Sequence, residues 1–259
     1  MSKMAHLTSA PPSAALAARL KSDFTLLEAH ERLVQLRHAV IGRVLFTTSF
    51  GLEDQVLTHL IASERLEVEI VTLDTGRLFP QTYELWQETE EHFGCRIRAL
   101  HPERDLLEAF VSDVGVNGFY SSLEARKACC DIRKVRPLAR ALAGASAWIT
   151  GLRSEQSPER NRSSLAEFDA ERELIKVNPL LDWTREETLS FARQRGVPTN
   201  PLHASGYLSI GCAPCTRAVR PGEDERSGRW WWESEEKKEC GLHVDANGRL
   251  TRATGAPQS

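Results

Sequence analysis

The sequence lacks the features that mark several broad classes of protein. No apolar run reaches the roughly 18 residues that a membrane-spanning helix needs. The formal net charge is only -3, which provides no general attraction to nucleic acids or anionic membranes. The N-terminus has no apolar core behind a basic start, so we expect no export signal and a cytoplasmic protein. With 41% hydrophobic and 27% charged residues, the composition is that of an ordinary globular protein.

Six cysteines are present, and four of them form two close pairs, Cys129-Cys130 and Cys212-x-x-Cys215. In a chain with no export signal, this favours metal or redox chemistry over a disulfide framework. Four thiolates suit either a tetrahedral zinc ion or an iron–sulfur cluster. Adjacent helical residues point about 100° apart, so two neighbouring thiolates share one centre only at a distorted or terminal turn. This strain favours a large polymetallic ligand, and two pairs of buried free thiols are the alternative.

Strand and helix patterns alternate along most of the chain. Apolar residues at helical spacing predict a helix pair over residues 14–40. Further helices are expected over residues 52–61, 80–93 and 184–195, the last with a T-x-x-E capping box, and Cys129-Cys130 is expected to open a helix to residue 142. Strands are expected at 44–48, 69–73, 95–100 and 147–151, with another strand or a hairpin within 169–177. This alternation predicts an α/β fold, a parallel sheet with helices on both faces.

Ligands of such sheets bind beyond the carboxyl ends of the strands, where three polar turns are expected. These turns are Ser49-Phe50-Gly51, Asp74-Thr75-Gly76 and the turn at Gly151. The first leads from a strand into a helix, so its N–H groups and the helix N-terminus can bind an anion, and Ser49 adds a hydroxyl donor. The loop over residues 153–162 leaves the same edge, and its guanidinium groups suit sulfate or phosphate oxygens. A plain structural turn or solvated loop is the alternative in each case.

The segment from Ser49 to Asp54 resembles the phosphate loop of the adenine-nucleotide PP-loop superfamily, whose usual form is S-G-G-x-D-S. Phe50 and Gln55 depart from that form. The departure favours a ligand with a shorter anionic tail than the triphosphate of ATP. It argues against a reaction that cleaves ATP and releases pyrophosphate.

Seven short motifs, in order from about residue 44 to residue 243, resemble those of the assimilatory adenylyl-sulfate (APS) reductases. They are Thr47-Thr48-Ser49-Phe50-Gly51, Leu73-Asp74-Thr75-Gly76, Lys127-Ala128-Cys129-Cys130, Gly151-Leu152-Arg153, Gly211-Cys212-Ala213-Pro214-Cys215, Gly228-Arg229-Trp230-Trp231-Trp232-Glu233 and Glu239-Cys240-Gly241-Leu242-His243. The resemblance implies a PP-loop (adenine-nucleotide alpha-hydrolase-like) fold. It also implies reduction of adenosine 5′-phosphosulfate to sulfite and AMP, with thioredoxin as electron donor.

The same resemblance implies roles for individual residues. A 4Fe-4S cluster would be held by Cys129, Cys130, Cys212 and Cys215. Relatives that act on 3′-phosphoadenylyl sulfate (PAPS) generally lack these four cysteines, so their presence favours APS. The sulfonucleotide would be bound by the residues Ser49, Phe50, Gly51, Asp74, Thr75, Gly76, Lys134, Arg153, Arg160, Arg226 and Arg229. Arg162 is an alternative to Arg160.

Cys240 remains as an extra thiol in charged surroundings. Reduction of sulfate to sulfite takes two electrons, whereas a single cluster normally passes one, so a dithiol donor fits better. We hypothesise that the Cys240 thiolate attacks the sulfuryl sulfur and expels AMP, and that a thioredoxin thiolate then releases sulfite from the cysteine S-sulfonate. Lys134, Arg226 and Arg229 would offset the repulsion between thiolate and sulfate.

We therefore expect a disordered N-terminus (residues 1–13), a sulfonucleotide-binding α/β domain with the cluster (14–215) and a mobile catalytic tail (216–259). The run Trp230-Trp231-Trp232 is expected to anchor the tail or dock a partner. Three other interpretations remain open: a PAPS reductase with a site for the 3′-phosphate, a PP-loop enzyme that thiolates tRNA, and a zinc-stapled binding module. We expect no nucleic-acid or membrane partner, and a homo-oligomer is compatible with the sequence.

Overall fold

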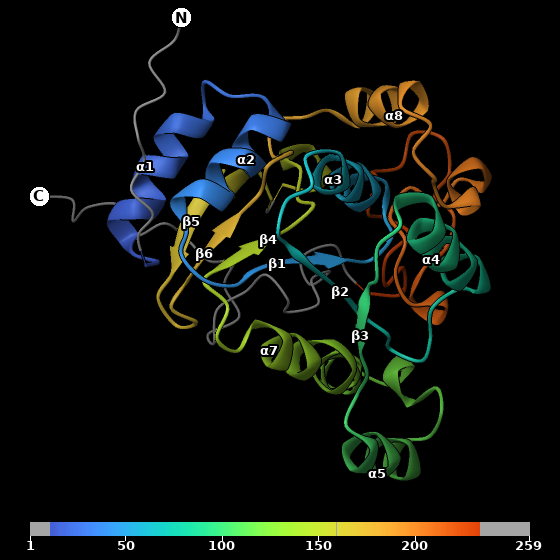
Figure 1. The fold of residues 1–259 in the computed structure, drawn as a ribbon. Helices are drawn as coiled ribbons and strands as arrows, with labels where there is room; N and C mark the ends of the chain where they lie inside the picture. Colours follow the sequence, from blue (N-terminus) through green and yellow to red (C-terminus); the bar gives the residue numbers. More distant parts are fainter. Residues whose placement is uncertain (1–10, 159, 234–259) are drawn as a thin grey trace, which may run out of the picture.

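The computed structural model describes residues 11–158 and 160–233, which form a six-stranded sheet between two layers of helices (Figure 1). The strand order is β3-β2-β1-β4-β6-β5, and every neighbouring pair is parallel except β5 and β6. The strands are β1 (Val44–Thr48), β2 (Glu69–Leu73), β3 (Arg98–Leu100), β4 (Ala147–Ile149), β5 (Ala166–Asp169) and β6 (Leu174–Val177). The predicted α/β fold is confirmed.

Helices cover both faces of this sheet, as Figure 1 shows for α1, α2, α3 and α8 on one side and α7 on the other. The α-helices are α1 (Ala14–Phe24), α2 (Ala29–Ala39), α3 (Leu52–Ser63), α4 (Pro80–Phe93), α5 (Arg104–Val114), α6 (Leu123–Cys130), α7 (Arg136–Leu142) and α8 (Arg185–Gln194). The predicted helix pair, capping box and helix from Pro80 to Phe93 are all present. In the capping box, the Glu187 N–H donates to the Thr184 hydroxyl at 3.1 Å and Glu187 accepts from the Thr184 N–H at 2.7 Å.

Alternate residues of each strand enter two separate cores, because successive side chains of a strand point to opposite faces. On β1, Val44 and Phe46 pack with the helices of the first layer, whereas Leu45 packs with Leu138 and Leu142 of α7. Burial on both faces explains why the strands appear as short continuous apolar runs in the sequence.

The boundary predicted for the third strand is wrong, because the strand begins at Arg98 and not at Cys95. Gly94 ends α4 in the left-handed conformation with φ of 60°, and the Cys95 N–H donates to the Glu90 carbonyl of that helix. Cys95 therefore belongs to the helix cap. The fourth strand is also shorter than expected and ends at Ile149, while the segment within 166–177 is a hairpin.

The helix predicted to open at Cys129-Cys130 instead reaches its end there. Its start is fixed upstream, where the Ser122 side chain accepts a hydrogen bond from the Ala125 N–H at 3.1 Å. A five-residue π-helical turn (Asp131–Val135) follows before α7 begins. The two cysteines thus lie at the kind of distorted terminal turn that two thiolates need to share one centre, and such π-turns are frequent at functional sites.

The chain reverses its direction across the sheet between β1 and β4. It runs from β1 outward through β2 and β3, and then returns to place β4 on the other side of β1. The carboxyl ends of these two neighbouring strands therefore flank a crevice, which is where ligands bind in open α/β sheets. Within the described ranges, no helix is long and apolar enough to cross a membrane.

Candidate functional site

A cavity of about 190 Å³ lies at this carboxyl edge, between the loops after β1, β2 and β4 and the segment from His203 to Trp230. Among the residues predicted to bind substrate, those that line it are Ser49, Phe50, Gly51, Thr75, Lys134, Arg160, Arg226 and Arg229. Asp74, Gly76 and Arg153 lie outside the lining. Cys240 lies outside the described residues, and the predicted domain limits and tail mobility stay predictions.

The turn after β1 is closed by a carboxylate of the helix that follows it. Asp54, in the first turn of α3, accepts hydrogen bonds from the Ser49 N–H at 2.6 Å and from the Ser49 hydroxyl at 2.8 Å. Burial raises the pKa of Asp54 to about 6, although the bonds from Ser49 act in the opposite direction. A Cβ at Gly151 would lie 2.3 Å from Oδ1 of Asp54, so only glycine allows the loop after β4 to approach this carboxylate.

Phe50 occupies a backbone conformation that glycine usually adopts, with φ of 59°. Its side chain is buried and stacks on Trp86, with 5.6 Å between the ring centroids. The strained conformation costs about 1–3 kcal/mol, and burying a phenylalanine contributes about 1.5–3 kcal/mol. These similar magnitudes explain how this chain tolerates the departure from the glycine-rich form.

The residues of the turn after β2 have two roles: Asp74 stabilises the turn, and Thr75 lines the cavity. Asp74 stabilises the turn itself, because its carboxylate accepts hydrogen bonds from the Gly76 N–H at 2.8 Å and the Tyr83 hydroxyl at 2.7 Å. Thr75 lines the cavity, and its hydroxyl oxygen is 3.3 Å from the sulfur of Cys212. The cavity and the cysteines are therefore neighbours.

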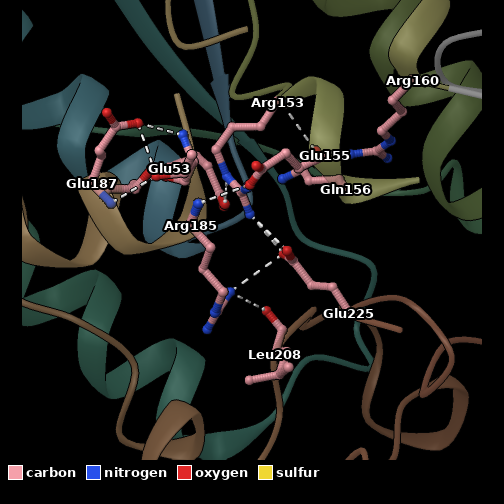
Figure 2. Close-up of polar contacts among 11 residues, drawn as sticks. Glu53, Arg153, Glu155, Gln156, Arg160, Arg185, Glu187, Leu208 and Glu225 are labelled. Carbon is pink, nitrogen blue, oxygen red and sulfur yellow. Dashed lines mark hydrogen bonds and ion pairs between the residues drawn. The ribbon is translucent and has the colours of Figure 1, made fainter. Parts of the chain in front are cut away.

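Arg153 lies behind the cavity in a buried ion-pair network (Figure 2). Its Nε donates to Glu53 at 2.7 Å, and its Nη2 donates to both carboxylate oxygens of Glu225 at 2.7 and 3.0 Å. Arg185 approaches the same Glu225 carboxylate at 3.3 Å. The network joins the first turn of α3 to the segment that carries Arg226, so Arg153 holds the cavity walls together.

The roles of Glu53 and Glu225 in this network were not predicted from the sequence. Glu53 could have been suspected, because acidic residues are enriched in the first turn of helices. Glu225 is 72 positions from Arg153 and carries no local signal.

On the loop after β4, Arg160 is buried, donates to the Gln156 side chain and reaches the cavity, whereas Arg162 is exposed.

Four cationic side chains, Lys134, Arg160, Arg226 and Arg229, line the same cavity. Arg229 passes directly over Gly211, where an added Cβ would lie 2.2 Å from its Nη2. The bridge between Thr216 and Arg229 folds the segment back toward the sheet. The C-terminal segment thus contributes two of the four cations, Arg226 and Arg229.

The four paired cysteines line one pocket beside the cavity and share it with Lys134 and Trp230. Each is buried and free of disulfide bonds. Across residues 11–158 and 160–233, no three His, Cys, Asp or Glu side chains lie close enough together to hold a single metal ion.

Two buried N–H donors at this pocket have no hydrogen-bond partner in the described part of the chain. They are Nε1 of Trp230 and Nε of Arg133, both on residues that line the pocket. Trp230 is 1% exposed and has a positive φ of 43°, so it is an anchored side chain rather than a surface one. Buried donors without acceptors are rare, and these two mark a place for an acceptor.

The chain is similar to known proteins over most of its length. Residues 43–218 match the family model described as the phosphoadenosine phosphosulfate reductase domain. The chain is 54% identical over 217 residues to the adenosine 5′-phosphosulfate reductase of Agrobacterium fabrum, covering 84% of each chain. It is 57% identical over 203 residues to the adenosine 5′-phosphosulfate reductase of Rhizobium meliloti, covering 78% of this chain and 77% of the relative.

Among solved structures, the crystal structure of the phosphoadenylyl-sulfate reductase of Candida auris in its phosphate complex superposes with a TM-score of 0.67 at 25% identity. The match covers 82% of this chain and 100% of the Candida auris chain. By fold, by the extent of the match and by identity to its relatives, the chain belongs to the phosphoadenosine phosphosulfate reductase family.

Proposed function

We propose that this chain is a thioredoxin-dependent adenylyl-sulfate reductase, which converts adenosine 5′-phosphosulfate to sulfite and AMP in sulfate assimilation and cysteine biosynthesis. The Agrobacterium fabrum and Rhizobium meliloti relatives are named for this substrate. The observation that carries the proposal is the convergence of Lys134, Arg226 and Arg229 on a cavity at the sheet's switch point, beside the four-cysteine pocket. We expect the reaction to take place in the cytoplasm.

The charge distribution of the cavity fits the two ends of this substrate. The phosphosulfate end is anionic, and the three cations can bind it directly. The cavity lining also includes Glu53, Asp54 and Glu225, and the carboxylates of Glu53 and Glu225 are paired with Arg153. A neutral ribose and adenine suit these carboxylates better than a second phosphate group does, and this supports APS over PAPS.

The chemistry proposed for Cys240 is nucleophilic substitution at sulfur. Its thiolate forms a bond to the sulfuryl sulfur while the bond from that sulfur to the phosphate oxygen breaks, and AMP leaves with the electron pair. A thioredoxin thiolate then attacks the Cys240 sulfur and sulfite leaves. The second thioredoxin thiol resolves the mixed disulfide, so the dithiol supplies both electrons.

The cations are needed because an anionic nucleophile attacks an anionic group. Lys134, Arg226 and Arg229 would lower that repulsion and stabilise the charge that moves onto the leaving oxygen. Trp230 lines the cavity and precedes Cys240 by ten residues, so the covalent reach of the chain is sufficient.

The four-cysteine pocket fits a 4Fe-4S cluster held by Cys129, Cys130, Cys212 and Cys215. Inorganic sulfides accept hydrogen bonds, and the unpaired donors of Trp230 and Arg133 would be available to supply them. When bound, such a cluster would join the end of α6 to the Cys212–Cys215 loop and act as a redox-capable centre beside Lys134. We assign the two-electron reduction to the thiols.

The experiment is a comparison of sulfite release from APS and from PAPS by the anaerobically purified full chain with thioredoxin. We expect APS to be the much better substrate, together with a brown protein that contains iron and acid-labile sulfide. Faster turnover of PAPS would indicate a PAPS reductase. Colourless protein with stoichiometric zinc and no turnover would indicate a binding module, and ATP hydrolysis with retained tRNA would indicate a thiolation enzyme.

A matched pair of variants tests the cationic end of the cavity. Arg226→Gln removes a charge that faces the cavity and should lower kcat/KM for APS roughly 100-fold. Arg220→Gln removes a charge from an exposed residue six positions earlier and should leave kcat/KM unchanged. Equal effects of the two substitutions would contradict the proposed substrate position.

A further inference from the structure

A buried ion pair joins α6 to the last described residue of the chain. Arg126 and Glu233 are 107 positions apart, and their side chains are only 1% and 8% exposed. Nε of Arg126 donates to Oε1 of Glu233 at 2.9 Å, and Nη2 donates to Oε2 at 2.7 Å. This two-bonded geometry fixes the orientation of the carboxylate as well as its distance.

The same guanidinium has two further contacts. It lies 4.7 Å from the centroid of the Trp230 ring, and the side chain of Cys130 accepts a hydrogen bond from it. Trp230 is itself held on the cysteine loop, because its backbone N–H donates to the Cys215 carbonyl at 3.1 Å. One arginine therefore touches a cysteine of the four-cysteine pocket, a wall of the substrate cavity and Glu233.

The position of Glu233 matters because Cys240 follows it by seven residues. Seven residues span at most about 24 Å when fully extended, so the point where Glu233 is held limits where the Cys240 thiol can act. A buried charge is costly to leave without its partner, which keeps Glu233 at α6. Loss of the pair would enlarge the volume that the thiol samples and lower its effective concentration at the cavity.

We infer that Arg126 and Glu233 are positioning residues for the nucleophilic thiol, because their ion pair anchors the root of the Cys240 segment to the helix that carries Cys129 and Cys130. This inference rests on the proposed Cys240 chemistry. It assigns to the Trp230–Glu233 region a task separate from substrate binding. It also gives one reason why the cysteine pocket and the thiol segment occur together in one chain.

The principal test uses Glu233→Gln, because Arg126 also donates a hydrogen bond to Cys130 and its substitution would disturb the cysteine pocket directly. Formation of the Cys240 S-sulfonate would be followed by mass spectrometry after rapid mixing with APS in the absence of thioredoxin. We expect the rate to fall roughly tenfold or more, while the dissociation constant for APS and the iron content stay within about twofold of wild type. Glu223→Gln is the matched control, because Glu223 pairs with Arg217 in the same segment and neither residue lines the four-cysteine pocket.

A second readout does not depend on turnover. Limited trypsin digestion would be timed at Lys237 and Lys238, which follow the anchor, and cleavage should be several-fold faster in Glu233→Gln than in wild type or Glu223→Gln. Glu233→Asp keeps the charge with a shorter side chain and should give an intermediate rate of cleavage. This variant replaces Glu233→Gln in the test if the glutamine variant fails to fold.

Wild-type rates of S-sulfonate formation and of cleavage in both Glu233 variants would overturn the inference. That result differs from a failure of the proposed function, in which Cys240 of the wild type itself acquires no sulfonate.

Discussion

Asp54 predicts a dependence of stability on pH that is opposite in sign to that of most carboxylates in proteins. Burial raises its pKa in the folded state from 3.8 to about 6. Below pH 3.8 the group is neutral in both the folded and the unfolded chain, and its contribution to stability is fully present. As the pH rises through 6, the folded state must ionise a buried carboxyl that the unfolded state ionises freely, so the contribution is lost.

The size of the effect follows from these two pKa values. Between pH 5 and pH 8 the difference in proton binding amounts to about 1.4 kcal/mol of unfolding free energy. Asp54→Asn removes the titration but keeps an oxygen that can accept from Ser49. The free energy of unfolding of the variant minus that of wild type should therefore increase by about 1.4 kcal/mol from pH 5 to pH 8.

Urea denaturation of both proteins at the two pH values, under anaerobic conditions, measures this double difference and cancels the titration of other groups. Asp113→Asn, which changes an exposed carboxylate on α5, is the matched control and should show no such trend. A variant-minus-wild-type difference that stays constant, or that decreases with pH, would refute the buried-carboxylate account of the turn after β1.

Two further substitutions test the walls of the cavity. Gly211→Ala places a Cβ against the Arg229 guanidinium, which must move; kcat/KM for APS should fall roughly tenfold or more while the melting temperature changes little, and wild-type turnover would contradict this. Glu225→Gln weakens the bonds of Arg153 but leaves Glu53 in place, so the loss of stability should be about 1–3 kcal/mol. An unchanged melting temperature would show that the network is not stabilising.

Local patterns in the sequence predicted the parts of the fold that depend on neighbouring residues. The capping box at Thr184 and the strand at Val44–Thr48 are both set by spacing and side-chain type within a few positions. The start of the helix at the paired cysteines was predicted too late in the chain. The apolar residues of α7 drew attention to residues 136–142, whereas α6 has charged residues at Glu124, Arg126 and Lys127 and its start depends on the single cap at Ser122.

Contacts across long separations could not be predicted in this way. Arg153 was expected at the substrate because arginines suit anions, yet its partners Glu53 and Glu225 come from segments that only the folded chain brings together. The anchor between Arg126 and Glu233 likewise depends on the path of the C-terminal segment past the cysteine pocket. The cations Lys134, Arg226 and Arg229 were predicted from resemblance, and the structure gathers all three at one cavity.

The most direct test of the account is the mass of the peptide that contains Cys240 after anaerobic incubation of the full chain with APS and no thioredoxin. We predict one sulfonate group on Cys240, which added thioredoxin releases as sulfite, and no adduct and no turnover in Cys240→Ser. An unmodified Cys240 in a protein that still reduces APS, or full activity of Cys240→Ser, would contradict it.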